Sequence, residues 1–284
     1  MFAGTKAPAA ARPRVTVDKI TKMFASDVEN MLPRHWSASR NHPLQEFLEQ
    51  GEIQELQDCS NRGVFGAPIK ITPSMTVIGL MWVYAVKKHE VTGLFRKVRC
   101  RITLMGNQER NLITRLEAYA PVAQTITARV LIVSHLHLKG ILYRKLDVKN
   151  AHINEYMKRE VQCKMPPGYL VYVNKSGGVT FRKLRQGEKQ PTDECLPLIM
   201  ALYGGMECGR IFWEAWVDWH IADGFQIIHE ERCYLQKRDG KGSWIKLCYH
   251  VDDNLIASLG EKYYASYLKR VGICLLYTSD AADE

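Results

Sequence analysis

The sequence contains no long uninterrupted apolar run. Its longest apolar stretch, residues 130–142, is interrupted by histidine and lysine and is too short to span a bilayer. Residues 1–14 are rich in alanine, proline, lysine and arginine, but they lack the continuous apolar segment of a secretory signal. We therefore expect a soluble protein that is neither secreted nor embedded in a membrane.

The sequence also has no paired cysteines. None of its eight cysteines forms a Cys-x-x-Cys pair or has the Cys/His spacing of a zinc knuckle, and no internal repeat is present. This pattern excludes a disulfide-stapled secreted domain and a small zinc module. We expect reduced thiols and a cytosolic or nuclear setting, and we assign no metal role to His135 and His137.

What the chain does have is a basic balance. Its 284 residues are 46% hydrophobic, enough for a substantial core, and 39 basic side chains against 30 acidic ones give a formal charge of +9. With a pI near 9.1, the protein favours a polyanionic partner and salt-sensitive binding to phosphate backbones. Charge alone does not establish a nucleic-acid partner.

Two adjacent carboxylates, Asp252 and Asp253, follow an alternating apolar run at residues 245–251 and precede another at 254–256. The pattern predicts two strands joined by a charged turn. Like charges about 4 Å apart repel by roughly 1 kcal/mol in water and about 4 kcal/mol at a partly shielded site, so a bound cation would stabilise the pair. A solvated turn is the alternative, because aspartate is a common turn residue.

A third carboxylate, Asp147, ends a short β-prone run at residues 141–147. The ends of the two strands could bring all three acids together. Magnesium prefers a few carboxylate oxygens with phosphates and water, and two such ions can hold the attacking and leaving oxygens of a phosphoryl transfer. The three acids therefore suit that chemistry.

Beyond the acids, several short motifs follow one another in order. They are Trp-Val-Tyr at 82–84, Arg-Lys-Val-Arg at 96–99, Tyr-Ala-Pro-Val at 119–122, Leu-Asp-Val-Lys-Asn-Ala-His-Ile-Asn at 146–154, Met-Pro-Pro-Gly-Tyr at 165–169, Ala-Leu-Tyr-Gly at 201–204 and His-Val-Asp-Asp at 250–253. Together they resemble the reverse transcriptase domain of copia-type long-terminal-repeat retrotransposons. The resemblance implies an α+β fingers-palm core with an antiparallel palm sheet and helices packed behind it. We expect the thumb to be missing, because the last residues, 274–284, resemble a translated sequencing adapter.

The resemblance also implies roles for single residues. The catalytic acids and ligands of two Mg²⁺ ions, replaceable by Mn²⁺, would be Asp147, Asp252 and Asp253, with the Val148 carbonyl as a further ligand. The nucleotide site would comprise Lys97, Arg99, Val148, His152 and Glu207, and the primer end would lie near His250, which strand alternation places on the face of Asp252. The partners would be an RNA or DNA template with primer and deoxynucleoside triphosphates. A solvated basic strand is the alternative for Lys97 and Arg99.

Some positions depart from the family pattern. His152 replaces the aromatic residue that excludes a ribose 2′-hydroxyl, and His250 replaces the leading tyrosine of the hairpin. Glu207 stands where the family has glutamine, Gly209 where it has proline, and residues 186–194 are a polar insertion. These departures put sugar discrimination and primer placement in doubt, so a non-catalytic relic that binds nucleic acid through charge remains an alternative. A template-independent nucleotidyltransferase is a third possibility.

Along the chain we expect a flexible basic tail at 1–35, a leading helix and fingers-like region at 36–140 and a palm-like region at 141–273. Helical spacing predicts helices at 36–60, 125–137 and 210–220, with Trp213 and Trp216 in the core. Asp239-Gly240 predicts a hairpin turn. Residues 274–284 resemble a translated sequencing adapter and are left out of the fold. A retrotransposon particle in the cytoplasm, or the nucleus, is the expected location.

Overall fold

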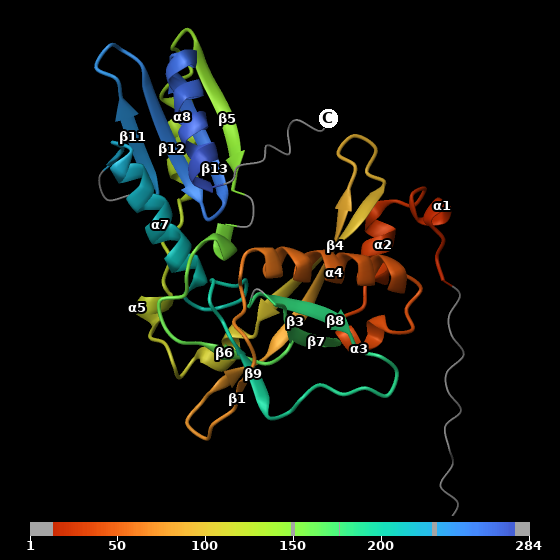
Figure 1. The fold of residues 1–284 in the computed structure, drawn as a ribbon. Coiled ribbons are helices and arrows are strands. Elements are labelled where there is room, and N and C mark those ends of the chain that lie inside the picture. Colours follow the sequence, from red (N-terminus) through yellow and green to blue (C-terminus); the bar gives the residue numbers. More distant parts are fainter. Residues whose placement is uncertain (1–13, 149–150, 176, 229–231, 276–284) are drawn as a thin grey trace, which may run out of the picture. The chain divides into compact units, whose positions relative to one another are not determined.

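The computed structural model describes residues 14–148, 151–175, 177–228 and 232–275, without the side chains of residues 151–152 and 273–275. Helices and predominantly antiparallel sheets occur together, so the predicted α+β class is confirmed (Figure 1). The expected adapter-like end lies outside the described residues, except for the last two residues of a helix.

The chain divides into two compact units, each built from two separate stretches of sequence. The first unit comprises residues 1–108 and 160–199, and the second comprises residues 109–159 and 200–284. This division differs from the boundary expected at residue 140. The segment 160–199 pairs its strands with strands that precede residue 80, so its membership follows from pairing over a long sequence distance.

The N-terminal segment of the first unit is ordered over much of the range predicted to be a flexible tail. Helices α1 (Val17–Ile20) and α2 (Ala25–Met31) form there, and the side chains of Ile20 and Val28 are fully buried. That part of the prediction was wrong because a few apolar side chains, set among polar ones, suffice to anchor short helices. Residues 1–13 lie outside the described residues.

The helix predicted at residues 36–60 is split in two. The first piece is α3 (Trp36–Ser39) and the second is α4 (Gln45–Asn61). Pro43 lies between them and cannot continue a helix, which explains the break. Leu48, Leu56 and Cys59 give α4 a buried face.

Helix α4 packs against a two-stranded antiparallel ribbon formed by β3 (Leu80–Lys88) and β4 (Phe95–Leu104). Burial alternates along β4: Val98, Cys100, Ile102 and Leu104 are buried, and the residues between them are more exposed. Lys97 and Arg99 therefore lie on the face of the ribbon opposite the buried one, as the period of a strand requires.

The other strands of the first unit are short. One sheet has the order β1-β9-β6-β2, and β7 and β8 form a separate hairpin. The bounds are β1 Ile69–Lys70, β2 Val77–Ile78, β6 Gln162–Cys163, β7 Tyr169–Val173, β8 Val179–Lys183 and β9 Glu194–Pro197.

The second unit is built on a five-stranded antiparallel sheet with the order β10-β11-β12-β13-β5. Its strands are β5 Ile141–Asp147, β10 Gln226–Ile227, β11 Tyr234–Arg238, β12 Trp244–His250 and β13 Asp253–Leu259. The turn predicted at Asp239-Gly240 joins β11 to β12, with Gly240 at φ 71° and the Asp239 carboxylate accepting from the Lys241 and Ser243 N–H groups. This hairpin is confirmed.

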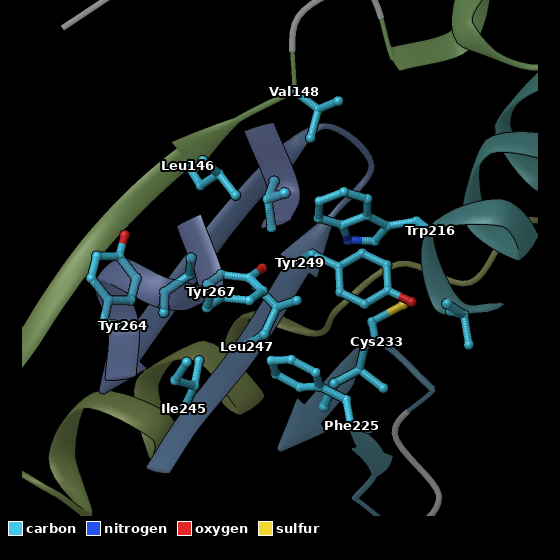
Figure 2. Close-up of a cluster of buried hydrophobic side chains, with 14 of the residues drawn as sticks. Leu146, Val148, Trp216, Phe225, Cys233, Ile245, Leu247, Tyr249, Tyr264 and Tyr267 are labelled. Carbon is cyan, nitrogen blue, oxygen red and sulfur yellow. The ribbon is translucent and has the colours of Figure 1, made fainter. Parts of the chain in front are cut away.

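One face of this sheet carries the core of the second unit (Figure 2). Alternate residues of β12, including Leu247 and Tyr249, pack against two helices, α7 (Cys208–Ala222) and α8 (Glu261–Leu275). Trp216 is almost fully buried in this cluster and Trp213 packs at its edge, so the predicted core role of both is confirmed. Helices α7 and α8 therefore cover and stabilise one face of the sheet.

The opposite face of the sheet is covered in part by α6 (Thr125–Val133), which is shorter than the predicted helix 125–137. Its Leu131 packs against Cys248 and Ala257. Two short elements complete the unit, α5 (Arg115–Ala118) and η2 (Ala151–Asn154), and a third, η1 (Gly106–Glu109), lies where the chain passes from the first unit to the second. The helices of the described residues are too short or too polar to cross a bilayer, and the seven described cysteines are buried and unpaired with one another.

Candidate active site

The predicted carboxylate hairpin is present as β12 and β13. His250 and Asp253 are Cα partners, so Val251 and Asp252 form a two-residue loop between the strands. Apolar residues alternate along β12 and are buried at Ile245, Leu247 and Tyr249. Because that face is buried, the register is fixed, and the acids lie at the end of the sheet.

The loop itself has an unusual backbone. Val251 has φ 56°, the only positive φ outside glycine among the described residues. A positive φ at the first central position alone is the pattern of a type II′ turn, where glycine is the usual residue. A β-branched residue in this region stores conformational strain of about 1–3 kcal/mol, and such strain collects at functional sites.

Strand β5 brings the third acid to the same place. It pairs with β13, and the register makes Asp147 the Cα partner of Asp253. Directly opposed residues of an antiparallel pair project to the same face, with Cβ atoms about 5 Å apart. The structure therefore places Asp147 and Asp253 side by side, although they are more than a hundred residues apart in sequence, and Asp252 lies in the adjoining loop.

His250 lies opposite Asp253 in the strand pairing. Simple alternation placed it on the face of Asp252, but the two-residue loop ends the alternation at His250. Its partner is Asp253, so His250, Asp253 and Asp147 form one row across three strands. All three side chains are exposed, whereas Asp252 is half-buried. A role for His250 at the primer end stays a prediction.

A lysine that the sequence reasoning did not single out contacts this row. Lys145 precedes Asp147 by two residues on β5, and its Nζ lies 2.8 Å from Oδ1 of Asp253. The hydrogen bond to Asp253 is the main cause that raises the pKa of Lys145, and the charges of Asp147 and Asp252 act in the same direction. The sequence places Lys145 on the face of Asp147, because residues two apart on a strand share a face, but the contact with Asp253 follows only from the pairing of β5 with β13.

Asn254 is a second residue whose role was missed. Its side chain is 1% exposed, and its Nδ2 donates to the carbonyl oxygens of Asp252 (2.8 Å) and Leu146 (3.2 Å). The Val148 N–H also donates to the Asp252 carbonyl, at 3.1 Å. These bonds tie the end of β5 to the loop, so Asn254 positions the backbone on which all three acids lie.

Asn254→Asp is expected to destabilise the second unit by about 3 kcal/mol, because a buried carboxylate would face two carbonyl oxygens without a donor. The Oδ1 atom of Asn254 has no hydrogen-bond partner among the described residues, so the change gains no compensating bond. Urea unfolding measures the effect, and the cost should shrink as the pH falls and the new carboxyl becomes protonated.

Asn174→Asp is the matched control for this change. The Oδ1 atom of exposed Asn174 accepts from the Gly178 N–H at 2.7 Å, a bond that a carboxylate keeps. We expect its effect to stay within about 0.5 kcal/mol. If both substitutions lower the free energy of unfolding equally, the hydrogen bonds donated by the Asn254 amide do not stabilise the unit.

The remaining predicted site residues are distributed differently. Lys97 and Arg99 belong to the first unit, and the acids belong to the second. Residue 152 lies in η2, close in sequence to Asp147, but the side chain of His152 is outside the described part of the chain. Val148 is almost fully buried, and a ligand role for its carbonyl stays a prediction.

Glu207 lies immediately before α7, and its carboxylate is paired with an arginine. Arg159 Nε lies 2.9 Å from Glu207 Oε1, and its Nη2 contacts Glu109, whose side chain is fully buried. Burial raises the pKa of Glu207, although the charge of Arg159 opposes the shift. Glu207 and Arg159 also line a cavity of about 510 Å³ in the second unit. The structure thus shows Glu207 in an ion pair with Arg159, and its contact with a nucleotide stays a prediction.

Asp147 and Asp253, with Asp252 in the adjoining loop, form what we call the acidic row. Its carboxylate oxygens are the kind of ligand that magnesium prefers. Mg²⁺ is usually held by one or two carboxylates, completed by substrate phosphates and water, and the row offers two opposed carboxylates with a third in the loop. Among the described residues no three His, Cys, Asp or Glu side chains converge on one point. The protein would therefore supply part of the coordination shell, and phosphates and water the rest.

Comparisons with known proteins relate the chain to retrotransposon polyproteins. No protein-family model matches the chain. It is 24% identical over 185 residues, 65% of the chain, to the retrovirus-related Pol polyprotein from transposon RE2 of Arabidopsis thaliana. It is 23% identical over 217 residues, 72% of the chain, to the Pol polyprotein from transposon RE1 of the same plant. The chain is similar to a stretch of retrotransposon Pol polyproteins.

That stretch is a small part of each relative. The matched regions cover 11% of the RE2 polyprotein and 13% of the RE1 polyprotein. The similarity by itself therefore supports a retrotransposon-derived region rather than a particular reaction. Any proposal about the reaction depends on the residues of the candidate site.

Proposed function

We propose that this chain is the fingers-palm part of a copia-type reverse transcriptase, an RNA-directed DNA polymerase that extends a primer with deoxynucleotides. One observation carries the proposal: the β5–β13 register sets Asp147 opposite Asp253, next to Asp252 in a strained two-residue loop. The similarity to retrotransposon Pol polyproteins supports the retrotransposon origin of the chain.

In this proposal the acids hold cations, and the backbone network holds the acids. Asp147, Asp252 and Asp253 would ligate two Mg²⁺ ions, with the Val148 carbonyl as a further oxygen donor. When bound, these ions would lower the pKa of the primer 3′-hydroxyl and stabilise the charge on departing pyrophosphate. Asn254 keeps the loop carbonyl and the end of β5 in place, so that the carboxylates are preorganised before substrate arrives.

Lys97 and Arg99 would supply the cations that meet the triphosphate. Lys97 and Arg99 lie on the open face of β4, where side chains two residues apart point the same way. Their charges would neutralise the β- and γ-phosphates during transfer. Template and primer would bind through the excess positive charge of the chain, which makes the affinity dependent on salt.

Primer extension on a homopolymeric RNA template tests this function. We expect the 284-residue chain to incorporate the complementary labelled deoxynucleotide in Mg²⁺ or Mn²⁺, and to incorporate little without template. Because His152 and His250 replace aromatic residues of the family, the variant His152→Phe/His250→Tyr should extend the primer faster.

Two outcomes would contradict the proposal. Incorporation that does not need a template would indicate a template-independent nucleotidyltransferase. Salt-dependent binding of template and primer without extension, by both the natural chain and the double variant, would indicate a relic that binds nucleic acid by charge. Lys97, Arg99 and Arg101, which follow one another on the same face of β4, favour this second function if catalysis is absent.

A further inference from the structure

Lys145 makes a direct ion pair inside the acidic row. It is the Cα partner of Leu255, two residues along both strands from the opposed pair Asp147 and Asp253. The diagonal between these positions is within reach of a long side chain, and Nζ of Lys145 lies 2.8 Å from Oδ1 of Asp253. The lysine side chain is 73% exposed and the aspartate 57%, so both are accessible to ions from solvent.

A cation stabilises the acidic row because it offsets the repulsion between the carboxylates. Two carboxylates that face each other across an antiparallel pair repel, and Asp252 adds a third negative charge in the next position of the chain. The ammonium of Lys145 supplies one positive charge on Asp253. A divalent ion at the same carboxylate would supply two, and the ammonium and the ion cannot both occupy the same oxygen.

We propose that Lys145 is a built-in counter-ion that competes with the divalent cation for Asp253 and thereby lowers the metal affinity of the hairpin. The inference rests on the proposed function, because it takes the acidic row to be the metal site. Metal binding then includes release of Lys145 from Asp253, and the strength of that ion pair sets part of the dissociation constant.

Manganese binding to the whole chain tests the proposal without any need for activity. The free Mn²⁺ signal in electron paramagnetic resonance gives the dissociation constant at low ionic strength. Lys145→Met removes the charge and keeps the length of the side chain, and we expect it to bind Mn²⁺ up to about fivefold more tightly. Lys145→Arg keeps the charge and should bind no more tightly than the natural chain.

Two further variants separate the ion pair from general charge effects. Lys262→Met removes the same charge from exposed Lys262 in the first turn of α8 and should leave the affinity unchanged. In an Asp253→Asn background the ion pair is absent, so the additional change Lys145→Met should have little effect. Because exposed charges are screened by salt, the difference between Lys145→Met and the natural chain should shrink at high ionic strength.

The outcomes distinguish this inference from the proposed function. If Asp147→Asn and Asp253→Asn weaken Mn²⁺ binding but Lys145→Met binds like the natural chain, the counter-ion role is wrong and the metal site stands. If neither acid substitution changes the Mn²⁺ dissociation constant, the acidic row is not a metal site. The proposed function and the counter-ion role of Lys145 are then both wrong. An equal gain for Lys145→Met and Lys262→Met would also overturn the role of Lys145.

Discussion

Asp147→Asn is expected to abolish template-directed nucleotide incorporation, with a loss of at least about 100-fold, the scale of removing one preorganised electrostatic group from an active site. The substitution keeps the shape of the side chain and removes its charge. It leaves the β5–β13 backbone pairing intact, so the free energy of unfolding should stay within about 1 kcal/mol of the natural value. Single-turnover incorporation measures the loss, and urea unfolding checks the fold.

Asp218→Asn is the matched control for this prediction. Asp218 is exposed on α7 and is not among the proposed site residues, so its loss should change incorporation less than twofold. Asp253→Asn should resemble Asp147→Asn, because the two residues face each other. If the chain keeps its activity with Asp147→Asn and with Asp253→Asn, these acids do not perform the chemistry.

Local sequence patterns were enough to predict the strands that carry the acids. The period-two alternation of residues 245–250 gives β12 its buried face, and the apolar run before Asp147 gives β5. The meeting of Asp147 with Asp253 was expected from the family resemblance, since no local pattern specifies which strands pair. The register brings the two acids opposite each other, and it also sets His250 opposite Asp253.

Residues that act through specific side-chain contacts were harder to predict. Asn254 looks like an ordinary turn residue, yet it is buried and bonds to two carbonyl groups. Lys145 looks like a surface lysine until the pairing of β5 with β13 brings it to Asp253. Both roles depend on a partner more than a hundred residues away or on burial, which single-sequence patterns do not encode.

The division of the chain into units differs from the boundary expected at residue 140 for the same reason. Strands β6 and β9 follow the residues of β5 in sequence but pair with β2 and β1 of the first unit. Pairing partners that are distant in sequence are chosen by packing, so the boundary placed at residue 140 from order along the chain did not match. The ordered segment 17–31 is a similar case, because burial of Ile20 and Val28 depends on tertiary contacts.

Arg159→Met is expected to destabilise the second unit by about 3–5 kcal/mol, the usual cost of leaving a buried carboxylate without its ionic partner. Glu109 is fully buried and would retain only the Met206 N–H, which donates to its Oε2 at 2.9 Å. The same arginine also pairs with Glu207 at the start of α7, so the change removes two ion pairs at once. Urea unfolding followed by circular dichroism measures the loss.

Replacing the buried acid together with the arginine separates an uncompensated charge from lost packing. Glu109→Gln keeps an oxygen for the Met206 N–H and removes the charge, so Arg159→Met/Glu109→Gln should recover much of the stability. Arg182→Met is the control: Arg182 pairs with Glu188 at 2.6 Å, but that carboxylate is partly exposed, so the loss of stability should be much smaller than for Arg159→Met. If the double variant is as unstable as Arg159→Met, Arg159 stabilises α7 through packing and not through the charge of Glu109.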